Sequence, residues 1–397
     1  MAELLTIDEA LDRIVEHARP LPVETMRVAE AAGRVLREPA RASVDLPPFP
    51  SSAMDGFALR AADAPGELPI AFRVAAGTAP PGPLPDGFAA GIATGGTVPE
   101  GADTVVPVEL AEDRGDHVAI GEPVSSGQHV RPRGGDVREG DTVAEPGTRL
   151  GPAQIGALSA AGIAKVACSK VPRVAVLATG SELRGAGETL APGQIFESNR
   201  AMLAAALARA GAEVEVLPVV ADDPAAHREA IARGLEADVL VTSGGVSMGE
   251  HDLVRRIEAE LGVEEVFWGV AVKPGKPISF GVRDGTLVFG LPGNPVSSLV
   301  GALVFVSTGL RAAQGEREPR PRYGLGVSAT PLRRNLQRDE FLRAVRSDDG
   351  NGVEVRAISG QESHMIARAA VADALIHVPR GDGLIDAGSV VRLLPLD

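Results

Sequence analysis

The stretch from residue 238 to residue 261 constrains the fold of this chain more than any other. Residues 238–241 form a short apolar run typical of a buried parallel strand, and apolar side chains return at helical spacing from Leu253 to Leu261. Gly244 and Gly245 lie between the two. Because glycine permits tight turns and a helix N-terminus attracts anions, the pattern predicts a strand, an anion-binding glycine turn and a helix.

Two acids in the same loop modify this interpretation. Glu250 and Asp252 would repel an anion unless a cation lay between the charges. The combination therefore indicates a phosphate-bearing ligand together with a divalent metal ion. Taken alone, the loop leaves an alternative open, in which it is an ordinary connection whose acids only cap the helix.

The same order of strand, polar glycine turn and helix recurs throughout residues 172–315. Strands are expected near 172–178, 212–220, 238–241 and 287–291, and helices near 198–210, from 222, from 253 and near 296–313. This alternation predicts a doubly wound, mostly parallel α/β domain with helices on both faces of its sheet. Ligands bind such sheets beyond the carboxyl ends of the strands, where Glu182, Asp222 and Asp252 are expected.

Three further parts make the predicted fold an α/β multidomain one. Residues 46–141 are rich in Gly, Pro and short apolar runs, which predicts an inserted β-rich domain. Residues 1–45 with 142–171 are expected to form an N-terminal helical and linker domain, with helices at about 7–20, 29–36 and 151–161. Beyond a charged, proline-bearing linker, residues 320–397 predict a C-terminal β-barrel-like domain.

Lysines are rare in this chain, and two of them share one short turn. The sequence holds four lysines among its 39 basic residues, and Lys273 and Lys276 stand three residues apart across Pro-Gly. A compact ammonium group suits a phosphate or another oxyanion, although a solvated turn is the alternative. Pro292 and Pro295 follow the next strand, and they would shape the same rim because proline fixes the backbone.

The composition argues against several classes of function. A net charge of −14 is unfavourable for a general nucleic-acid surface. Cys168 is the single cysteine, so neither an intrachain disulfide nor a zinc–cysteine cluster is expected. The N-terminus has no basic start followed by an apolar run, and the apolar run at 299–306 is shorter than the roughly 20 residues of a membrane span. We therefore expect a cytoplasmic protein that binds neither nucleic acid nor membrane.

Five motifs in order resemble one known family over essentially the full length. They are Ser52-Ala-Met-Asp-Gly-Phe-Ala58, Ile92-Ala-Thr-Gly-Gly96 followed by Val98-Pro-Glu-Gly-Ala-Asp103, Thr242-Ser-Gly-Gly-Val-Ser-Met-Gly249, Lys273-Pro-Gly-Lys-Pro277 and Gly290-Leu-Pro-Gly-Asn-Pro-Val296. Together they are similar to the molybdopterin molybdenumtransferase family, which is MoeA in bacteria and the E domain of gephyrin in animals. The α/β domain would then be of the molybdopterin-binding type.

The resemblance implies an enzyme of molybdenum cofactor biosynthesis. The family inserts molybdate into adenylylated molybdopterin, with release of AMP and the aid of Mg²⁺. Its members are elongated homodimers, and the active cleft lies between the α/β domain of one subunit and the β-rich domain of the partner. Further expected partners are the molybdopterin adenylyltransferase and the molybdoenzymes that receive the cofactor.

The resemblance also implies roles for individual residues. Catalytic acids would be Asp55, Asp136, Glu182, Asp222 and Asp252, of which the last three would also bind the metal. Substrate would be bound by Thr94, Arg131, Ser243, Gly244, Gly245, Ser247, Lys273, Lys276, Pro292, Pro295, Arg343 and Ser363. One departure is Ser181, which stands where many members have an acid or its amide.

Two other functions fit parts of this pattern. The α/β domain alone resembles molybdopterin adenylyltransferases, but the Ser-Ala-Met-Asp-Gly region is typical of the insertion family. A catalytically inactive scaffold like the gephyrin E domain would keep the fold and bind a protein partner. The acids and lysines at the expected strand ends favour an enzyme over such a scaffold.

Overall fold

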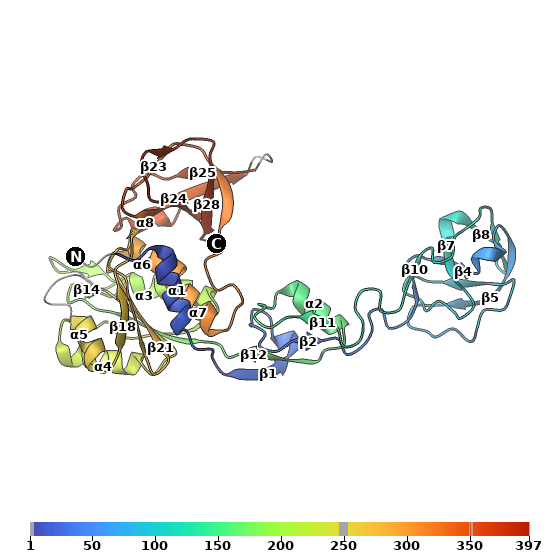
Figure 1. Cartoon of the computed structure of the whole chain (residues 1–397), viewed down its shortest axis with the longest axis horizontal. Coiled ribbons are helices and arrows are strands. Elements are labelled where there is room, and N and C mark those ends of the chain that lie inside the picture. Colours follow the sequence, from blue (N-terminus) through green and yellow to red (C-terminus); the bar gives the residue numbers. More distant parts are fainter. Residues whose placement is uncertain (1–3, 246–252, 349, 351, 397) are drawn as a thin grey trace.

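The structure is a computed structural model and describes residues 4–245, 253–348, 350 and 352–396. The chain is elongated (Figure 1). The α/β domain and the C-terminal β domain lie together at one end, and the inserted β-rich domain lies at the other. A narrow segment made of two separate stretches of chain joins the two ends. This arrangement confirms the predicted multidomain fold class.

A six-stranded sheet in the order β16-β13-β17-β21-β20-β18 forms the centre of the α/β domain. Its parallel strands are β13 (Arg173–Ala178), β16 (Glu213–Val216), β17 (Val239–Ser243) and β21 (Thr286–Leu291). The antiparallel strands are β18 (Glu264–Trp268) and β20 (Ser279–Arg283). The helices are α3 (Asn199–Arg209), α4 (Pro224–Gly234), α5 (Leu253–Glu260) and the run of α6 (Pro295–Gly301), the π-helix η4 (Ala302–Val306) and α7 (Ser307–Ala313).

Side chains alternate along the central strands and so create two apolar layers. Val174 and Val176 of β13 belong to the layer that contains α3 and the run from α6 to α7. Ala175 and Leu177 point the other way and pack with residues of α4 and α5. Successive residues of a strand face opposite sides of the sheet, so this pattern requires helices on both faces. The doubly wound topology is confirmed.

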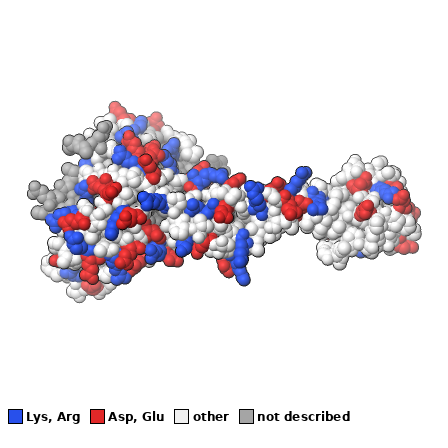
Figure 2. All heavy atoms as spheres, turned by 60° about the horizontal axis from the view of Figure 1, so that its bottom comes forward, with Lys and Arg blue, Asp and Glu red and all other residues white. Residues whose placement is uncertain are grey.

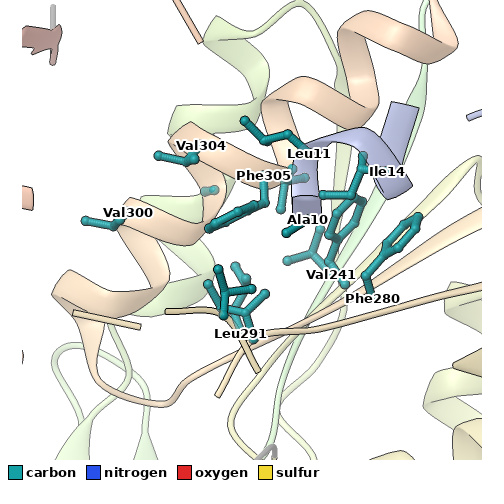
Figure 3. Packing of buried hydrophobic residues seen from close by; sticks show 14 of the residues in the cluster. Ala10, Leu11, Ile14, Val241, Phe280, Leu291, Val300, Val304 and Phe305 are labelled. Carbon is teal, nitrogen blue, oxygen red and sulfur yellow. The ribbon is translucent and has the colours of Figure 1, made fainter. Parts of the chain in front are cut away.

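The first helix, α1 (Ile7–His17), packs in the core of the α/β domain. Thr6 caps the helix through a capping box with Glu9, as the sequence predicts. Ala10, Leu11 and Ile14 pack with Val300, Val304 and Phe305 of the C-terminal helical run and with Phe280 of the sheet (Figure 3). The predicted division placed residues 1–45 with the linker, but the apolar face of α1 is buried in the α/β domain.

The helical run at residues 295–313 is the central helix of this layer. Within the described residues it is one helix of 19 residues, and its most apolar stretch has a mean hydropathy of 1.6. By length and composition alone it could cross a membrane, but 78% of that stretch is buried inside the protein. The hydroxyls of Ser307 and Thr308 donate to the carbonyls of Ala302 and Val304, at 2.9 and 2.7 Å. Such back-bonding accompanies the π-helical turn at this point.

The connecting segment combines two short β pairings with one helix. The pairs are β1 (Val23–Arg27) with β12 (Lys165–Ser169) and β2 (Ala40–Arg41) with β11 (Thr142–Ala144), and the helix is α2 (Pro152–Ala160). The helix expected at 29–36 is wrong. Only Val28–Glu30 form a 3₁₀ turn (η1), because Val35 and Leu36 are buried in bridges to Arg149 and Cys168.

The inserted domain contains a six-stranded sheet in the order β7-β4-β6-β5-β9-β8. Its strands are β4 (Gly56–Leu59), β5 (Gly66–Val74), β6 (Ala89–Ile92), β7 (Thr104–Pro107), β8 (Ala111–Asp113) and β9 (His117–Ile120). A separate pair, β3 (Ser51–Ser52) with β10 (Val130–Arg131), lies where the domain meets the connecting segment. Two 3₁₀ turns, η2 (Ala61–Asp63) and η3 (Val108–Leu110), complete it.

The C-terminal domain is a closed β-barrel. The strands β24 (Asp339–Asp348), β25 (Val353–Ala357), β22 (Gly324–Ser328), β28 (Val390–Pro395) and β26 (Ala374–Val378) pair in this order, and β26 pairs again with β24. The domain also contains a small strand pair, β23 (Leu332–Arg333) with β27 (Leu384–Ile385), and the short helix α8 (Ile366–Ala369). From the α/β domain, β19 (Val272–Lys273) pairs with β24 and joins the two domains.

The position of α1 can be tested by shortening a buried side chain. Ile14 is fully buried in the α/β core, so Ile14→Ala should lower the free energy of unfolding by about 2–5 kcal/mol, as cavity-creating substitutions do. Val23→Ala, at a side chain that is 46% exposed, should change it by less than about 0.5 kcal/mol. Denaturant unfolding measures both, and equal losses would contradict the placement of α1.

Candidate active site

A cavity of about 760 Å³ lies at the carboxyl ends of β13, β17 and β21, beside the barrel segment that contains His364 and Ile366. This is the edge of the sheet at which a ligand is expected. Seven residues that the sequence assigns to the site line it: Glu182, Asp222, Ser243, Gly244, Gly245, Pro292 and Pro295. The sheet therefore brings together residues that are more than a hundred positions apart in sequence.

The glycine turn after β17 requires glycine for two reasons. Gly244 and Gly245 have φ angles of +97° and +69°, a conformation that other residues rarely adopt. A Cβ on Gly244 would lie 2.8 Å from the carbonyl oxygen of Thr179, and one on Gly245 would lie 2.5 Å from Cγ2 of Val254. The N–H of Gly244 donates to the carbonyl of Leu291 at 3.0 Å, so this amide holds two strand ends together and is not directed at a ligand.

Beneath the turn, Asn199 links the ends of β17 and β21. Its Nδ2 donates to Oγ of Ser243 at 2.8 Å and to the carbonyl of Gly293 at 2.7 Å. The side chain is 8% exposed, and its Oδ1 is buried without a hydrogen-bond partner among the residues that the structure describes. Ser243 is buried as well, and its hydroxyl lies 3.3 Å from that of Ser298. The side chain of Ser243 thus supports the rim from below.

Two of the predicted acids, Glu182 and Asp222, lie on neighbouring loops of the cavity. Asp222 and Ser181 bond reciprocally: the N–H of Ser181 donates to Oδ2 of Asp222 at 3.3 Å, and the N–H of Asp222 donates to Oγ of Ser181 at 3.0 Å. Gly180 has a φ of +153°, and a Cβ there would lie 2.5 Å from Oε2 of Glu182. The Glu182 carboxylate therefore folds back over the glycine that precedes it.

The two lysines have different surroundings, and the lining residues of the cavity include neither. Lys273 forms an ion pair with Glu340 of the barrel, with 3.0 Å between Nζ and Oε1, and Asn335 donates to the same oxygen at 3.1 Å. Lys276 adjoins Pro277, which lines the cavity, and its ammonium group has no hydrogen-bond or ion-pair partner among the described residues. Lys273 is thus the more exposed of the two, and Lys276 is the one whose charge is not paired within the described residues.

Arg343 lies on β24 of the barrel and organises the segment that faces the cavity. It is completely buried, and it donates to the carbonyls of Gly360, Glu362 and Met365. Burial lowers the pKa of its guanidinium group from the usual value. Ser363 lies in this segment, and its carbonyl accepts the N–H of Val296 at the start of α6, at 3.0 Å. Both residues thus hold the barrel against the rim.

The remaining predicted residues lie in the inserted domain, at the other end of the chain (Figure 1). Oδ1 of Asp55 accepts the N–H of Thr94 at 2.7 Å, and this bond holds the pKa of the Asp55 carboxyl below its usual value. Arg131 is exposed on β10, and Asp136 is exposed beyond it, where its N–H donates to the carbonyl of Leu46 at 2.9 Å. One chain therefore presents two separate groups of candidate residues.

A magnesium site is compatible with the described part of the cavity. Glu182 and Asp222 supply carboxylate oxygens there, and Mg²⁺ commonly binds one or two carboxylates together with water and substrate phosphate. Within residues 4–245, 253–348, 350 and 352–396, no group of three or more His, Cys, Asp or Glu side chains is arranged to hold a metal. Asp252, which is the third predicted metal ligand, lies outside the described residues, and so does Ser247, which is predicted to bind substrate.

Comparison with known proteins gives matches along the whole chain. Three family models match: the MoeA N-terminal region (domain I and II) at residues 5–162, a probable molybdopterin binding domain at 175–312 and the MoeA C-terminal region (domain IV) at 326–396. The chain is 33% identical to a molybdopterin molybdenumtransferase of Haemophilus influenzae over 99% of both chains, and 36% identical to molybdopterin molybdenumtransferase 2 of Mycobacterium tuberculosis over 96% of this chain and 97% of that one.

The chain belongs to the molybdopterin molybdenumtransferase family.

Solved structures agree with this assignment. Two crystal structures of MoeA proteins from Pyrococcus horikoshii match. One has a TM-score of 0.79 at 30% identity and covers 100% of both chains. The other has a TM-score of 0.85 at 28% identity and covers 99% of this chain and 100% of that one. The predicted membership in the molybdopterin molybdenumtransferase family is confirmed.

The surface of this family member carries charges of both signs. Figure 2 shows basic and acidic side chains interspersed over the larger end of the molecule, and an inserted domain whose drawn face is mostly uncharged. An anionic ligand would therefore depend on individual cations such as Lys276, since the chain as a whole has a net charge of −14.

Sequence reasoning missed Asn199 and His364, which both line the cavity. Asn199 directly follows Ser198, the N-cap residue of α3, and a second polar residue at a helix start has no distinctive signal in the sequence. His364 follows Ser363, and it reaches the cavity only because the barrel segment docks on α6. Both contributions depend on tertiary contacts.

The link made by Asn199 predicts a sharp difference between two chemically identical substitutions. Asn199→Asp removes both donors and sets a carboxylate against the carbonyl of Gly293, so the free energy of unfolding should fall by about 1–3 kcal/mol or more. Asn294→Asp adds the same charge at an exposed helix cap and should be nearly neutral. Thermal unfolding of both variants measures this, and equal midpoints would rule out the link.

Proposed function

We propose that this protein inserts molybdate into adenylylated molybdopterin and releases AMP. The observation that carries the proposal is the joint position of two acids, Glu182 and Asp222, and the Gly244–Gly245 turn around one cavity of a family member. A volume of about 760 Å³ lies within the range of small-molecule sites, which is roughly 300–1,000 Å³.

The reaction breaks the phosphoanhydride bond that joins the pterin phosphate to AMP. Phosphoryl chemistry of this kind needs positioning and neutralisation of charge more than a protein nucleophile. We assign Lys276 to the oxygens of phosphate or molybdate, because its ammonium group has no partner among the described residues. Lys273 would contribute only if substrate competed with Glu340 for it.

Magnesium is part of this proposal. Glu182, Asp222 and Asp252 would hold the ion, which would neutralise phosphate charge next to the acids. The bond between Ser181 and Asp222 fixes one of these carboxylates in direction. Without a cation, two carboxylates at one rim would repel an anionic substrate.

The proposed assembly is a homodimer. Asp55, Thr94, Arg131 and Asp136 lie in the inserted domain, far from the cavity of the same chain (Figure 1). A second subunit in antiparallel orientation would bring its inserted domain to this cavity and complete the site. The adenylyltransferase and recipient molybdoenzymes as partners, and a cytoplasmic location, remain predictions that follow from the same activity.

Molybdate-dependent release of AMP is the direct test. Purified protein with adenylylated molybdopterin should release AMP only with molybdate, and faster with Mg²⁺. Glu182→Gln, Asp222→Asn, Asp252→Asn and Lys276→Ala should each slow it about 100-fold or more, as loss of a preorganised charge does. Glu213→Gln, an exposed acid on β16 outside the cavity, is the matched control.

Activity without molybdate, from ATP and molybdopterin, would instead indicate an adenylyltransferase. Failure to bind molybdopterin would indicate a scaffold.

The shared site can be tested by mixing inactive subunits. If Asp55→Ala and Asp222→Asn act in the same cleft of a dimer, each variant alone is inactive. Mixed dimers would then regain activity, because one of their two clefts contains both intact residues. Mixing Glu182→Gln with Asp222→Asn subunits serves as the control and should restore nothing. Equal activity in the two mixtures would refute a site shared between subunits.

A further inference from the structure

One wall of the cavity carries an exposed aromatic side chain in a chain that has few of them. Phe196 lines the cavity and is 47% exposed, the largest exposed fraction among the ten phenylalanines. Six of the other nine are at most 5% exposed, as is usual for this residue. An exposed ring at a cavity gives up the stabilisation that burial would provide, so its position needs a reason.

The backbone around Phe196 is fixed on both sides. Phe196 belongs to β15 (Ile195–Phe196), which pairs in parallel with β14 (Leu183–Arg184). The N–H of Ile195 donates to the carbonyl of Glu182 at 3.0 Å, and the N–H of Glu197 donates to the carbonyl of Arg184 at 2.8 Å. The backbone next to Phe196 is therefore bonded directly to Glu182, one of the acids that line the cavity.

The residue after Phe196 strengthens this anchoring. The Glu197 side chain is 5% exposed and forms an ion pair with Arg200, with 2.9 Å between Oε2 and Nε. Arg200 also donates to the carbonyl of Leu217 at 2.6 Å. The buried pair fixes the start of α3, so Phe196 cannot fold into the domain without breaking it. The ring is thus held at the cavity while its face stays accessible.

We propose that Phe196 is a substrate-positioning residue whose ring stacks on a planar heterocycle of the substrate. The inference rests on the proposed function, since adenylylated molybdopterin carries two such heterocycles, the pterin and the adenine. Aromatic side chains stack on the π-face of flat heterocycles, as they do on the bases of nucleic acids. Ile195, which also lines the cavity, extends the apolar surface beside the ring.

Binding of the two halves of the substrate tests the proposal. Titrations with molybdopterin, kept anaerobic, and with AMP identify which heterocycle is stacked. Phe196→Ala and Phe196→Leu should weaken binding of that ligand about tenfold, whereas Phe196→Tyr keeps the ring and should bind within about threefold of the original protein. Leu190→Ala is the control, because Leu190 is an exposed apolar residue, at 39%, in the same connection but outside the cavity lining.

Several outcomes would overturn it. If Phe196→Ala binds both ligands as tightly as the original protein, or if Phe196→Leu does, the ring face has no role. If Phe196→Ala instead changes the molecular mass in solution with unchanged binding, the residue belongs to a subunit interface. In steady-state assays the variant should raise KM with kcat largely kept. Failure of the proposed function is separate: the unmodified protein would then release no AMP, whatever Phe196 does to binding.

Discussion

The parallel pairing of β13, β17 and β21 is the interaction on which the site depends. It sets the register that places Ser243 beside Leu291, and the N–H of Gly244 continues the pairing by donating to the Leu291 carbonyl. Asn199 then fastens the same two strand ends from below. Because these bonds are made by backbone and buried amide groups, the ends of β17 and β21 are held in place by the fold itself, which favours precise positioning.

The long shape of the chain separates the candidate residues into two groups and would give the proposed dimer a chemical role. The cavity offers acids, a glycine turn and a nearby lysine, and the inserted domain offers Asp55, already fixed by the N–H of Thr94. Neither group can reach the other within one subunit (Figure 1). A cleft completed by a partner would therefore explain why the inserted domain is carried on a narrow connecting segment.

Local patterns predicted most of the fold, and tertiary contacts account for the differences. The alternation in residues 172–315 and the short β runs elsewhere have strong periodic signals, so their strands were predictable. The burial of α1 in the α/β domain was not, because an amphipathic helix does not reveal which core it joins. In the same way, the sequence of residues 29–36 predicts a helix, but Val35 and Leu36 instead form β-bridges to Arg149 and Cys168.

The same distinction holds for the site. Glycines, acids and prolines at strand ends were predictable because parallel strands bring their carboxyl ends to one edge. The partners of Lys273 and Arg343 were not. Glu340 reaches Lys273 only through the docked barrel, and the carbonyls of residues 360–365 reach Arg343 only through the folding of the barrel domain itself. Only four of the 39 basic residues are lysines, and the barrel already engages one of them, Lys273. If the proposed function holds, Lys276 would attract the anionic substrate more than Lys273 does, which makes its substitution the more discriminating of the two.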